Sequence, residues 1–225
     1  MTGTLYGIGI GPGDAELLTL KAVRLLKECP VLAWPAPLEG DGLARTIAAP
    51  HIPAGKTEIA IRLSFRPERD DTDAAYDCAA ATIAGHLESG SDVGVLCEGD
   101  PLFFGSFIYL MTRLKRFPIQ VVPGIASPMA AAAVALHPLS TLEDAVAIIP
   151  ATRPEAEIER LLQSAESAVL MKIGRHLPKV RRVLDRLGLT HKALLVERAT
   201  QASQRILPLA DAAEAPYFSL VLVHS

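Results

Sequence analysis

The chain alternates short apolar runs with longer segments in which apolar side chains recur at helical spacing. The strand-like runs lie at residues 5–10, 31–34, 58–63, 93–97 and 119–122, and then at 145–149, 168–173, 193–197, 204–207 and 218–223. Such alternation of strands and helices is typical of α/β proteins with mainly parallel sheets. The closer spacing of the last strands predicts a mixed sheet in the second half.

Helical segments lie between these runs. Residues 15–29 carry leucines at near-helical spacing, with Asp14 as the expected N-cap and Pro30 as the stop. Residues 70–89 open with aspartates and end before a glycine, and residues 127–136 form a small-residue helix suited to close packing. The short polar connection KRFP at 115–118 predicts an N-terminal α/β domain at 1–116 and a C-terminal one at 117–225.

Composition and charge narrow the range of partners. The chain has 225 residues, half of them hydrophobic, which is enough for one large or two small globular domains. Its formal net charge of -3 gives no field that would gather nucleic acid or an anionic membrane surface. An anionic ligand must therefore meet local basic groups.

Cysteine and histidine usage points away from disulfides and metals. Cys29, Cys78 and Cys97 are odd in number and form no C-x-x-C pair, and the six histidines never fall at metal-ligand spacing. The first residues lack a signal-peptide pattern, and no apolar run approaches bilayer length. We therefore expect a soluble protein of the reducing cytoplasm without a bound metal.

The loop GIGIGPGD at residues 7–14 follows a strand and precedes a helix, as a dinucleotide-binding loop does. A G-x-G-x-x-G match that starts at Gly7 places Pro12 at the third glycine, and one that starts at Gly9 places Asp14 there. The Asp14 carboxylate would also repel a pyrophosphate from the helix N-terminus. The loop is therefore either the rim of a different ligand cleft or a structural strand-to-helix turn.

Three further segments combine a strand end with glycine, proline and small polar residues: 98–101 (EGDP), 123–127 (PGIAS) and 197–200 (ERAT). Open α/β sheets bind ligands at the carboxyl ends of their strands. Short side chains there expose backbone N–H and C=O groups to an adenosine or an amino-acid carboxylate. Each segment alone is more often only a turn.

Taken together and in order, these motifs resemble the tetrapyrrole (corrin/porphyrin) methyltransferase family over essentially the whole chain. The matching pieces are the glycine loop with residues 17–22 (LLTLKA), EGDP at 98–101, VVPGIAS at 121–127 and PYFSLVLV at 216–223. Residues 98–107, 34–35, 170–174 and the closing strand look most like the members that methylate precorrin-2 or cobalt-factor II at C20 in cobalamin biosynthesis.

The resemblance implies two α/β domains with the active site in the cleft between them, a homodimer, and S-adenosylmethionine as the methyl donor. Carried onto matching positions, the cofactor contacts are Gly99, Asp100, Pro101, Ala126, Ser127, Met171, Ala199, Thr200 and Ser219. The glycine loop, with Pro12, Gly13 and Asp14, would face the tetrapyrrole instead. Relatives usually carry a hydroxyl residue where this chain has Ala126, so a hydroxyl contact is lost there.

A reduced tetrapyrrole carries acetate and propionate arms, so its site needs cations. The candidates near strand ends or loops are Arg62, Arg66, Arg69, Arg113, Lys115, Lys172 and Arg175, of which Arg62 and Lys172 are our choices. Trp34, with the prolines that follow it, either forms an aromatic wall against the flat macrocycle or fills the core at a strand end. We expect it to be the wall.

Methyl transfer from a sulfonium is an in-line displacement, so the protein needs mainly to align the reactants and to exclude water. Alignment alone can lower such a barrier by roughly 7–11 kcal/mol, and we expect no nucleophilic side chain. Loss of a proton from the methylated ring calls for a general base, for which Asp14 and Glu98, or Asp100, are candidates. Asp14 is equally well explained as a helix cap and Asp100 as a turn former.

Three alternatives stay open at this point. Another tetrapyrrole methyltransferase would act on a different ring carbon or on uroporphyrinogen III. A catalytically silent module would bind the cofactor or a tetrapyrrole without transferring a methyl group. A nicotinamide-dependent oxidoreductase is disfavoured by the broken glycine fingerprint.

Overall fold

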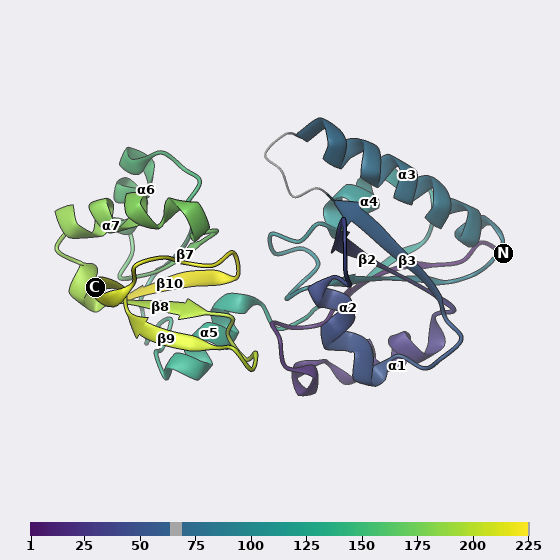
Figure 1. The fold of residues 1–225 in the computed structure, drawn as a ribbon, viewed down its shortest axis with the longest axis horizontal. Coiled ribbons are helices and arrows are strands. Elements are labelled where there is room, and N and C mark those ends of the chain that lie inside the picture. The colour runs from purple at the N-terminus through teal and green to yellow at the C-terminus, as the bar shows by residue number, and fades with distance from the viewer. Residues whose placement is uncertain (64–68, 225) are drawn as a thin grey trace. The chain divides into compact units, whose positions relative to one another are not determined.

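The computed structural model describes residues 1–63 and 69–224 and consists of two compact units, Met1–Ala126 and Ser127–Ser225 (Figure 1). Each unit is a five-stranded sheet with helices, so the expected pair of α/β domains, the first parallel and the second mixed, is confirmed. The boundary between the units lies after residue 126, later in the chain than the expected boundary after residue 116. The reason is that the strand at Ile119–Val122 pairs with the first strand of the chain and so completes the first sheet.

The first sheet is parallel throughout and has the order β3-β2-β4-β1-β5. Its strands are β1 (Leu5–Gly9), β2 (Val31–Pro37), β3 (Thr57–Leu63), β4 (Val93–Cys97) and β5 (Ile119–Val122). Its helices are α1 (Leu20–Glu28), α2 (Leu43–Ala48), α3 (Arg69–Glu88) and α4 (Phe107–Arg113), with short 3-10 turns η1 (Ala15–Leu17) and η2 (Ala49–His51). All five strands therefore end at one edge of the sheet.

Alternate side chains of the central strands enter two separate cores. From β2, Val31 and Ala33 pack with α3 and α4, whereas Leu32, Trp34 and Ala36 pack with α1 and α2. This two-residue period is the geometry of an extended strand, and a strand covered on both faces is apolar at every position. That is why residues 31–36 read as an unbroken apolar run.

The predicted helix 15–29 is wrong in its first part. Asp14 caps only the 3-10 turn η1, because its Oδ1 accepts the Glu16 N–H at 2.8 Å. Leu18 and Thr19 are then extended, and α1 starts after Thr19, whose Oγ1 accepts the Ala22 N–H at 3.2 Å. Two good N-cap residues compete here, and the threonine begins the longer helix. The helix expected at 70–89 is confirmed as α3.

The second sheet has the order β6-β7-β10-β8-β9, in which β6 and β7 are parallel and β10 is antiparallel to both β7 and β8. Its strands are β6 (Val146–Pro150), β7 (Ser167–Met171), β8 (Ala193–Glu197), β9 (Arg205–Pro208) and β10 (Ser219–His224). Its helices are α5 (Ser127–Ala135), α6 (Glu155–Leu162) and α7 (Leu177–Arg186), with 3-10 turns η3 (Gly174–His176), η4 (Thr190–Lys192) and η5 (Leu209–Asp211). Helices α6 and α7 lie on one face of this sheet, and α5 packs against β10 (Figure 1).

Within residues 1–63 and 69–224, no helix has the length and apolar character needed to cross a membrane.

Candidate functional site

The loops that leave β1 and β4 must pass one another at the edge of the first sheet. The chain leaves β1 for β2, which lies beyond β4, and it leaves β4 for β5, which lies beyond β1. At the crossing, Gly11 and Gly99 exchange backbone hydrogen bonds, with Gly99 N to Gly11 O at 2.8 Å and Gly11 N to Gly99 O at 3.3 Å. The polar backbone groups of Gly99, which we expected to contact the cofactor, are therefore already paired with the first glycine loop.

Three glycine backbones make this crossing possible. A Cβ added to Gly9 would lie 2.5 Å from Gly124 N and 2.9 Å from Gly99 O, and one added to Gly124 would overlap the same Gly99 oxygen. Only residues without a side chain allow such a close approach. The GIGIGPGD, EGDP and PGIAS motifs therefore meet at one place on the first sheet.

Asp100 fastens two of these motifs together. Its Oδ1 accepts the Leu102 N–H at 2.9 Å, and its Oδ2 accepts the Gly124 N–H at 3.1 Å. This pattern is that of a turn-forming aspartate whose second oxygen links a neighbouring loop. The buried Pro101 follows it, and Gly105 returns so closely that an added Cβ would overlap Pro101 O.

Glu98 lies beside the N-terminus of α2. Its Oε1 accepts the Ala44 N–H at 3.2 Å, and burial raises the pKa of the Glu98 carboxyl above its ordinary value, with the amides of Glu98 and Ala44 offsetting part of this effect. Asp14, the other proposed base, is exposed at the same edge of the sheet. The partly buried Pro12 and Gly13 precede it and lead into η1 instead of a full helix, so the glycine loop lacks the helix N-terminus that binds a pyrophosphate.

Trp34 is not the exposed wall that we expected. Its side chain is only 3% exposed and belongs to the core formed with α1 and α2, because Trp34 lies on a central strand whose faces are both covered. Its indole Nε1 is buried without a hydrogen-bond partner in the described part of the chain. The guanidinium carbon of Arg45 lies 5.7 Å from the centre of the indole ring.

The basic candidates of the first unit differ in their contacts. Arg62 is exposed, and its Nη1 donates to Pro37 O and Gly40 O. Arg113, at the end of α4, forms ion pairs with Asp73 and Asp77 of α3, so its charge is already neutralised. Arg66 and the side chain of Arg69 lie outside the described residues.

The second unit gathers the remaining predicted residues at one sheet edge. The pairs Leu220 with Met171 and Ser219 with Glu197 place the start of β10 beside the ends of β7 and β8. Met171 and Lys172, Ala199 and Thr200, and Ser219 therefore lie at the same edge. The Ser219 hydroxyl is buried and donates to Pro216 O at 2.6 Å, and Thr200 N donates to Gln204 Oε1 at 2.7 Å.

Left-handed backbone at non-glycine residues marks the ends of these strands. Lys172 after β7, and Arg198 and Thr200 after β8, have φ of 58°, 46° and 67°. In the first unit Phe104, in the loop after β4, has φ of 55°. Such conformations cost of order 1–3 kcal/mol each and concentrate at ligand-binding sites. Arg198 and Phe104 were not among the site residues predicted from the sequence. Among residue types, mainly glycine and asparagine indicate a left-handed backbone conformation.

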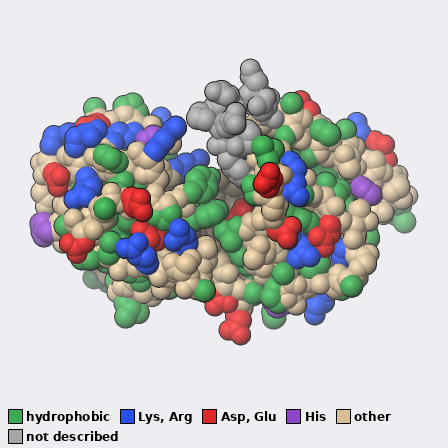
Figure 2. All heavy atoms as spheres, viewed as in Figure 1, with side chains coloured by type: hydrophobic (Ala, Val, Ile, Leu, Met, Phe, Trp, Pro, Cys, Tyr) green, Lys and Arg blue, Asp and Glu red, His purple; other side chains and the backbone are tan. Residues whose placement is uncertain are grey.

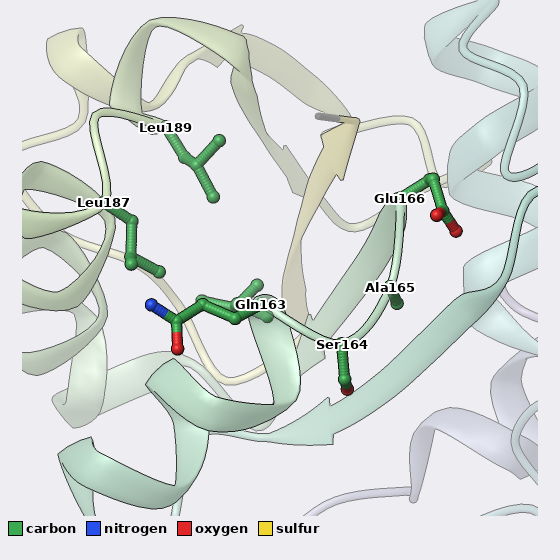
Figure 3. A pocket seen from close by; sticks show the side chains of 7 residues that line it. Gln163, Ser164, Ala165, Glu166, Leu187 and Leu189 are labelled. Atoms are coloured by element: carbon green, nitrogen blue, oxygen red, sulfur yellow. The ribbon is translucent and has the colours of Figure 1, made fainter.

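Other features of the second unit do not coincide with this edge. A shallow hollow of about 410 Å³ lies where β7 begins, at the opposite end of that strand, and Figure 3 shows Gln163, Glu166 and Leu189 around it. Lys and Arg side chains gather over α6 and α7 (Figure 2), but Arg182 and Arg186 pair with Glu155 at 2.6 and 2.9 Å. These cations therefore form a surface ion-pair network.

Two buried cysteines, Cys29 and Cys97, have raised pKa values. Burial raises the pKa of Cys29 to about 12 and also raises the pKa of Cys97, so neither thiol is a ready nucleophile. Among residues 1–63 and 69–224, no group of three or more His, Cys, Asp or Glu side chains is arranged to hold a metal ion.

Comparison with known proteins gives consistent similarities. Residues 4–213 match the family model described as Tetrapyrrole (Corrin/Porphyrin) Methylases. A precorrin-2 C(20)-methyltransferase of Sinorhizobium sp is 42% identical over 98% of this chain and 95% of its own length. A cobalt-precorrin-2 C(20)-methyltransferase of Salmonella typhimurium is 32% identical over 100% of this chain and 97% of its own length.

Among solved structures, a uroporphyrin-III C-methyl transferase from Thermus thermophilus, complexed with S-adenyl homocysteine, has a TM-score of 0.73. It is 25% identical to this chain, and the match covers 99% of this chain and 98% of that one.

The glycine crossing predicts a sharp difference between two alanine substitutions. Gly124→Ala forces a methyl group against Gly99 O and should lower the free energy of unfolding by about 1–3 kcal/mol, as overpacking does. Gly85→Ala is the matched control, because its added Cβ meets nothing within 4 Å on α3 and should raise the free energy of unfolding by up to about 1 kcal/mol. Urea denaturation measures both values. Equal stabilities of the two variants would contradict the close approach.

The raised pKa of Glu98 predicts a pH-dependent stability. Because the folded protein then holds the proton at a higher pH than the unfolded chain, the free energy of unfolding falls as pH rises from the ordinary glutamate pKa through the raised one. Glu98→Gln removes this contribution, so its stability relative to the wild type should increase with pH across that range. Urea denaturation at several pH values between about 4 and about 8 measures the difference. A difference independent of pH would show that burial does not raise this pKa.

Proposed function

The chain belongs to the tetrapyrrole (corrin/porphyrin) methylase family, and we propose that it is an S-adenosylmethionine-dependent enzyme of cobalamin biosynthesis that methylates precorrin-2 at C20, giving precorrin-3A. The observation that carries this proposal is the 42% identity to a precorrin-2 C(20)-methyltransferase over 98% of this chain and 95% of that protein. The lower identity, 32%, to the relative named for the cobalt complex favours the metal-free substrate.

The backbone of the second unit fits a small ligand held by main-chain groups. Lys172, Arg198 and Thr200 have left-handed backbone after β7 and β8, and the small residue Ala199 lies between the last two. We assign the cofactor to this edge, with Met171, Ala199, Thr200 and Ser219, and to the loops of Gly99–Pro101 and Ala126–Ser127. S-adenosylmethionine, when bound, supplies an electrophilic methyl group on a cationic sulfur.

The tetrapyrrole is assigned to the loops of the first unit and to cations at the strand ends. Pro12, Gly13 and Asp14 lie at the carboxyl edge of the parallel sheet, with Arg62 at the end of β3. In the second unit, Lys172 follows β7. Arginine and lysine suit the carboxylate arms of the substrate. Trp34 acts here only through the core on which the neighbouring loop rests.

The reaction requires few chemically active side chains. Displacement at a sulfonium methyl group needs alignment of the two reactants and exclusion of water, which positioned backbone loops supply. Because Asp14 is exposed at the edge to which we assign the tetrapyrrole, we assign removal of the ring proton to its carboxylate.

We further propose a cytoplasmic homodimer. None of the three cysteines forms a disulfide, which suits a reducing compartment. Several large apolar side chains of the second unit are largely exposed, among them Leu136 at 90% and Tyr217 at 73%, and an interface with a second copy of the chain would remove such side chains from water. Light scattering of the purified protein measures the mass, and a monomer would contradict this part of the proposal.

The proposed reaction predicts a defined product. Under anaerobic conditions, the protein and carbon-13-labelled S-adenosylmethionine should add one methyl group to precorrin-2, and NMR should locate the label at C20. Parallel incubation with cobalt-factor II should give less product. Label at another ring carbon would overturn the regiospecificity, and cofactor binding without any methylation would indicate a silent binding module.

The assignment of Asp14 predicts a selective loss of turnover. Asp14→Asn keeps the oxygen that accepts the Glu16 N–H but removes the base, so kcat should fall about 100-fold or more while the affinity for S-adenosylhomocysteine stays unchanged. Single-turnover methylation and calorimetry measure the two quantities. A kcat within about twofold of the wild type would remove Asp14 from the mechanism, because a lost general base costs far more than this.

A further inference from the structure

The loop after β2, residues 38–42, is held from both sides by polar side chains at the ends of the neighbouring strands. From β3, Arg62 Nη1 donates to Pro37 O at 2.9 Å and to Gly40 O at 2.5 Å. From β4, the carboxylate of Glu98 accepts the N–H of Ala44, in the first turn of α2 after the loop, at 3.2 Å. We call these two side chains, Arg62 and Glu98, the loop clamp.

The strand order explains why the loop clamp exists. β2 lies between β3 and β4, and all three strands are parallel and end at the same edge. A side chain at the end of each outer strand therefore reaches the loop that leaves the middle one. The Arg62 guanidinium donates charge-assisted hydrogen bonds, which are stronger than neutral ones, and the Glu98 oxygen accepts the bond at the other side, so both ends of the loop are fixed.

The base of the loop is also packed. Gly42 is buried, and a Cβ there would overlap Pro35 O and lie 3.0 Å from Trp34 Cδ1. Arg45 of α2 binds both carboxylate oxygens of Glu58 at 2.9 Å beside the same indole. The base of the loop therefore packs closely against the buried core of the first unit.

The tip of the loop is open and chemically distinct. Leu38 is 63% exposed, and a Cβ added to Gly40 at φ of 85° would meet nothing within 4 Å. The flanking Glu39 and Asp41 are exposed carboxylates. Such a tip repels the carboxylate arms of a tetrapyrrole and suits a stretch of ring edge that bears none, such as a bridging carbon.

We propose that Arg62 and Glu98 are positioning residues, which hold the 38–42 loop as a fixed wall for the reacting edge of the tetrapyrrole. This inference rests on the proposed function, since it names the part of the chain that orients that substrate. It adds a hold on this loop to the carboxylate contact proposed for Arg62, and it gives Glu98 a role other than removal of the ring proton.

Steady-state kinetics of variants test the loop clamp by the sign of the effect. At a pH above the raised pKa of Glu98, removal of its negative charge would by electrostatics alone improve binding of an anionic substrate. We expect Glu98→Ala instead to raise the KM for precorrin-2 about three- to tenfold, the value of one lost hydrogen bond, with the KM for S-adenosylmethionine unchanged. Glu98→Gln keeps an oxygen that accepts the Ala44 N–H and should stay within about twofold of the wild type.

Arg62→Ala should raise the same KM by a similar factor. The double variant should be less impaired than the product of the two single effects, because both residues hold one loop. Arg116→Ala and Glu88→Ala are the matched controls, since these two residues form an exposed ion pair elsewhere on the first unit.

Tryptophan fluorescence reports on the loop without turnover. Trp34 is the single tryptophan of the chain, and its indole lies under Gly42. A loosened loop admits water, so Glu98→Ala and Arg62→Ala should shift the emission of Trp34 to longer wavelength, whereas Glu98→Gln and both controls should not.

Distinct results would overturn the inference. A large loss of kcat in Glu98→Gln would make Glu98 a proton acceptor. A raised KM in Arg62→Ala but not in Glu98→Ala would show that Arg62 acts only as a direct ligand of a substrate carboxylate. Unchanged Trp34 emission in both alanine variants would contradict the loop clamp itself. Failure of the wild-type protein to methylate precorrin-2, with the emission shifts as expected, would instead contradict the proposed function and with it the substrate role of the loop.

Discussion

The first unit depends on a close approach of backbone at the point where two loops cross. Gly9, Gly99 and Gly124 come from three different motifs, and a side chain at Gly9 or at Gly124 would collide with the backbone of the neighbouring loop. The crossing brings the first glycine loop, the EGDP turn and the PGIAS segment to one edge, and Asp100 then links the last two through the Gly124 N–H. The residues that we assign to ligands in this unit occupy the ends of loops held in place by that contact. Glycine at these positions therefore serves backbone packing.

Much of this arrangement could be predicted from the sequence. The broken G-x-G-x-x-G pattern argues against a dinucleotide site, and the structure supplies a second argument, since η1 and extended residues separate the loop from α1. The apolar runs predicted the positions of the strands, because the burial of a β-strand produces a short-range pattern in the sequence. The extent of the first domain was not predictable in the same way, because β5 belongs to it only through pairing with β1, more than 100 residues earlier.

The parts that the sequence did not predict depend on long-range contacts. Trp34 has an aromatic side chain that could stack on a flat ligand, and only its place on a central strand makes it a core residue. Glu98 is a candidate general base by its motif, yet its oxygen accepts an N–H from a helix 54 positions away in the chain. The left-handed backbone of Lys172 and Arg198 has no local signature. Side-chain chemistry can be read from residue types, but the partner of each polar group follows from strand order.

The strand order of the first sheet also has a consequence for synthesis on the ribosome. β1 is made first, but its neighbours in the sheet are β4 and β5, the last two strands of the unit. While the chain emerges, β2 and β3 can pair at once, whereas β1 must wait with both edges unpaired until residue 122 is available. An unpaired apolar strand of this kind is a template for wrong partners. Nascent chains of this fold therefore pass through a stage at which association with a chaperone, or slow translation before β4, would have its greatest effect on yield.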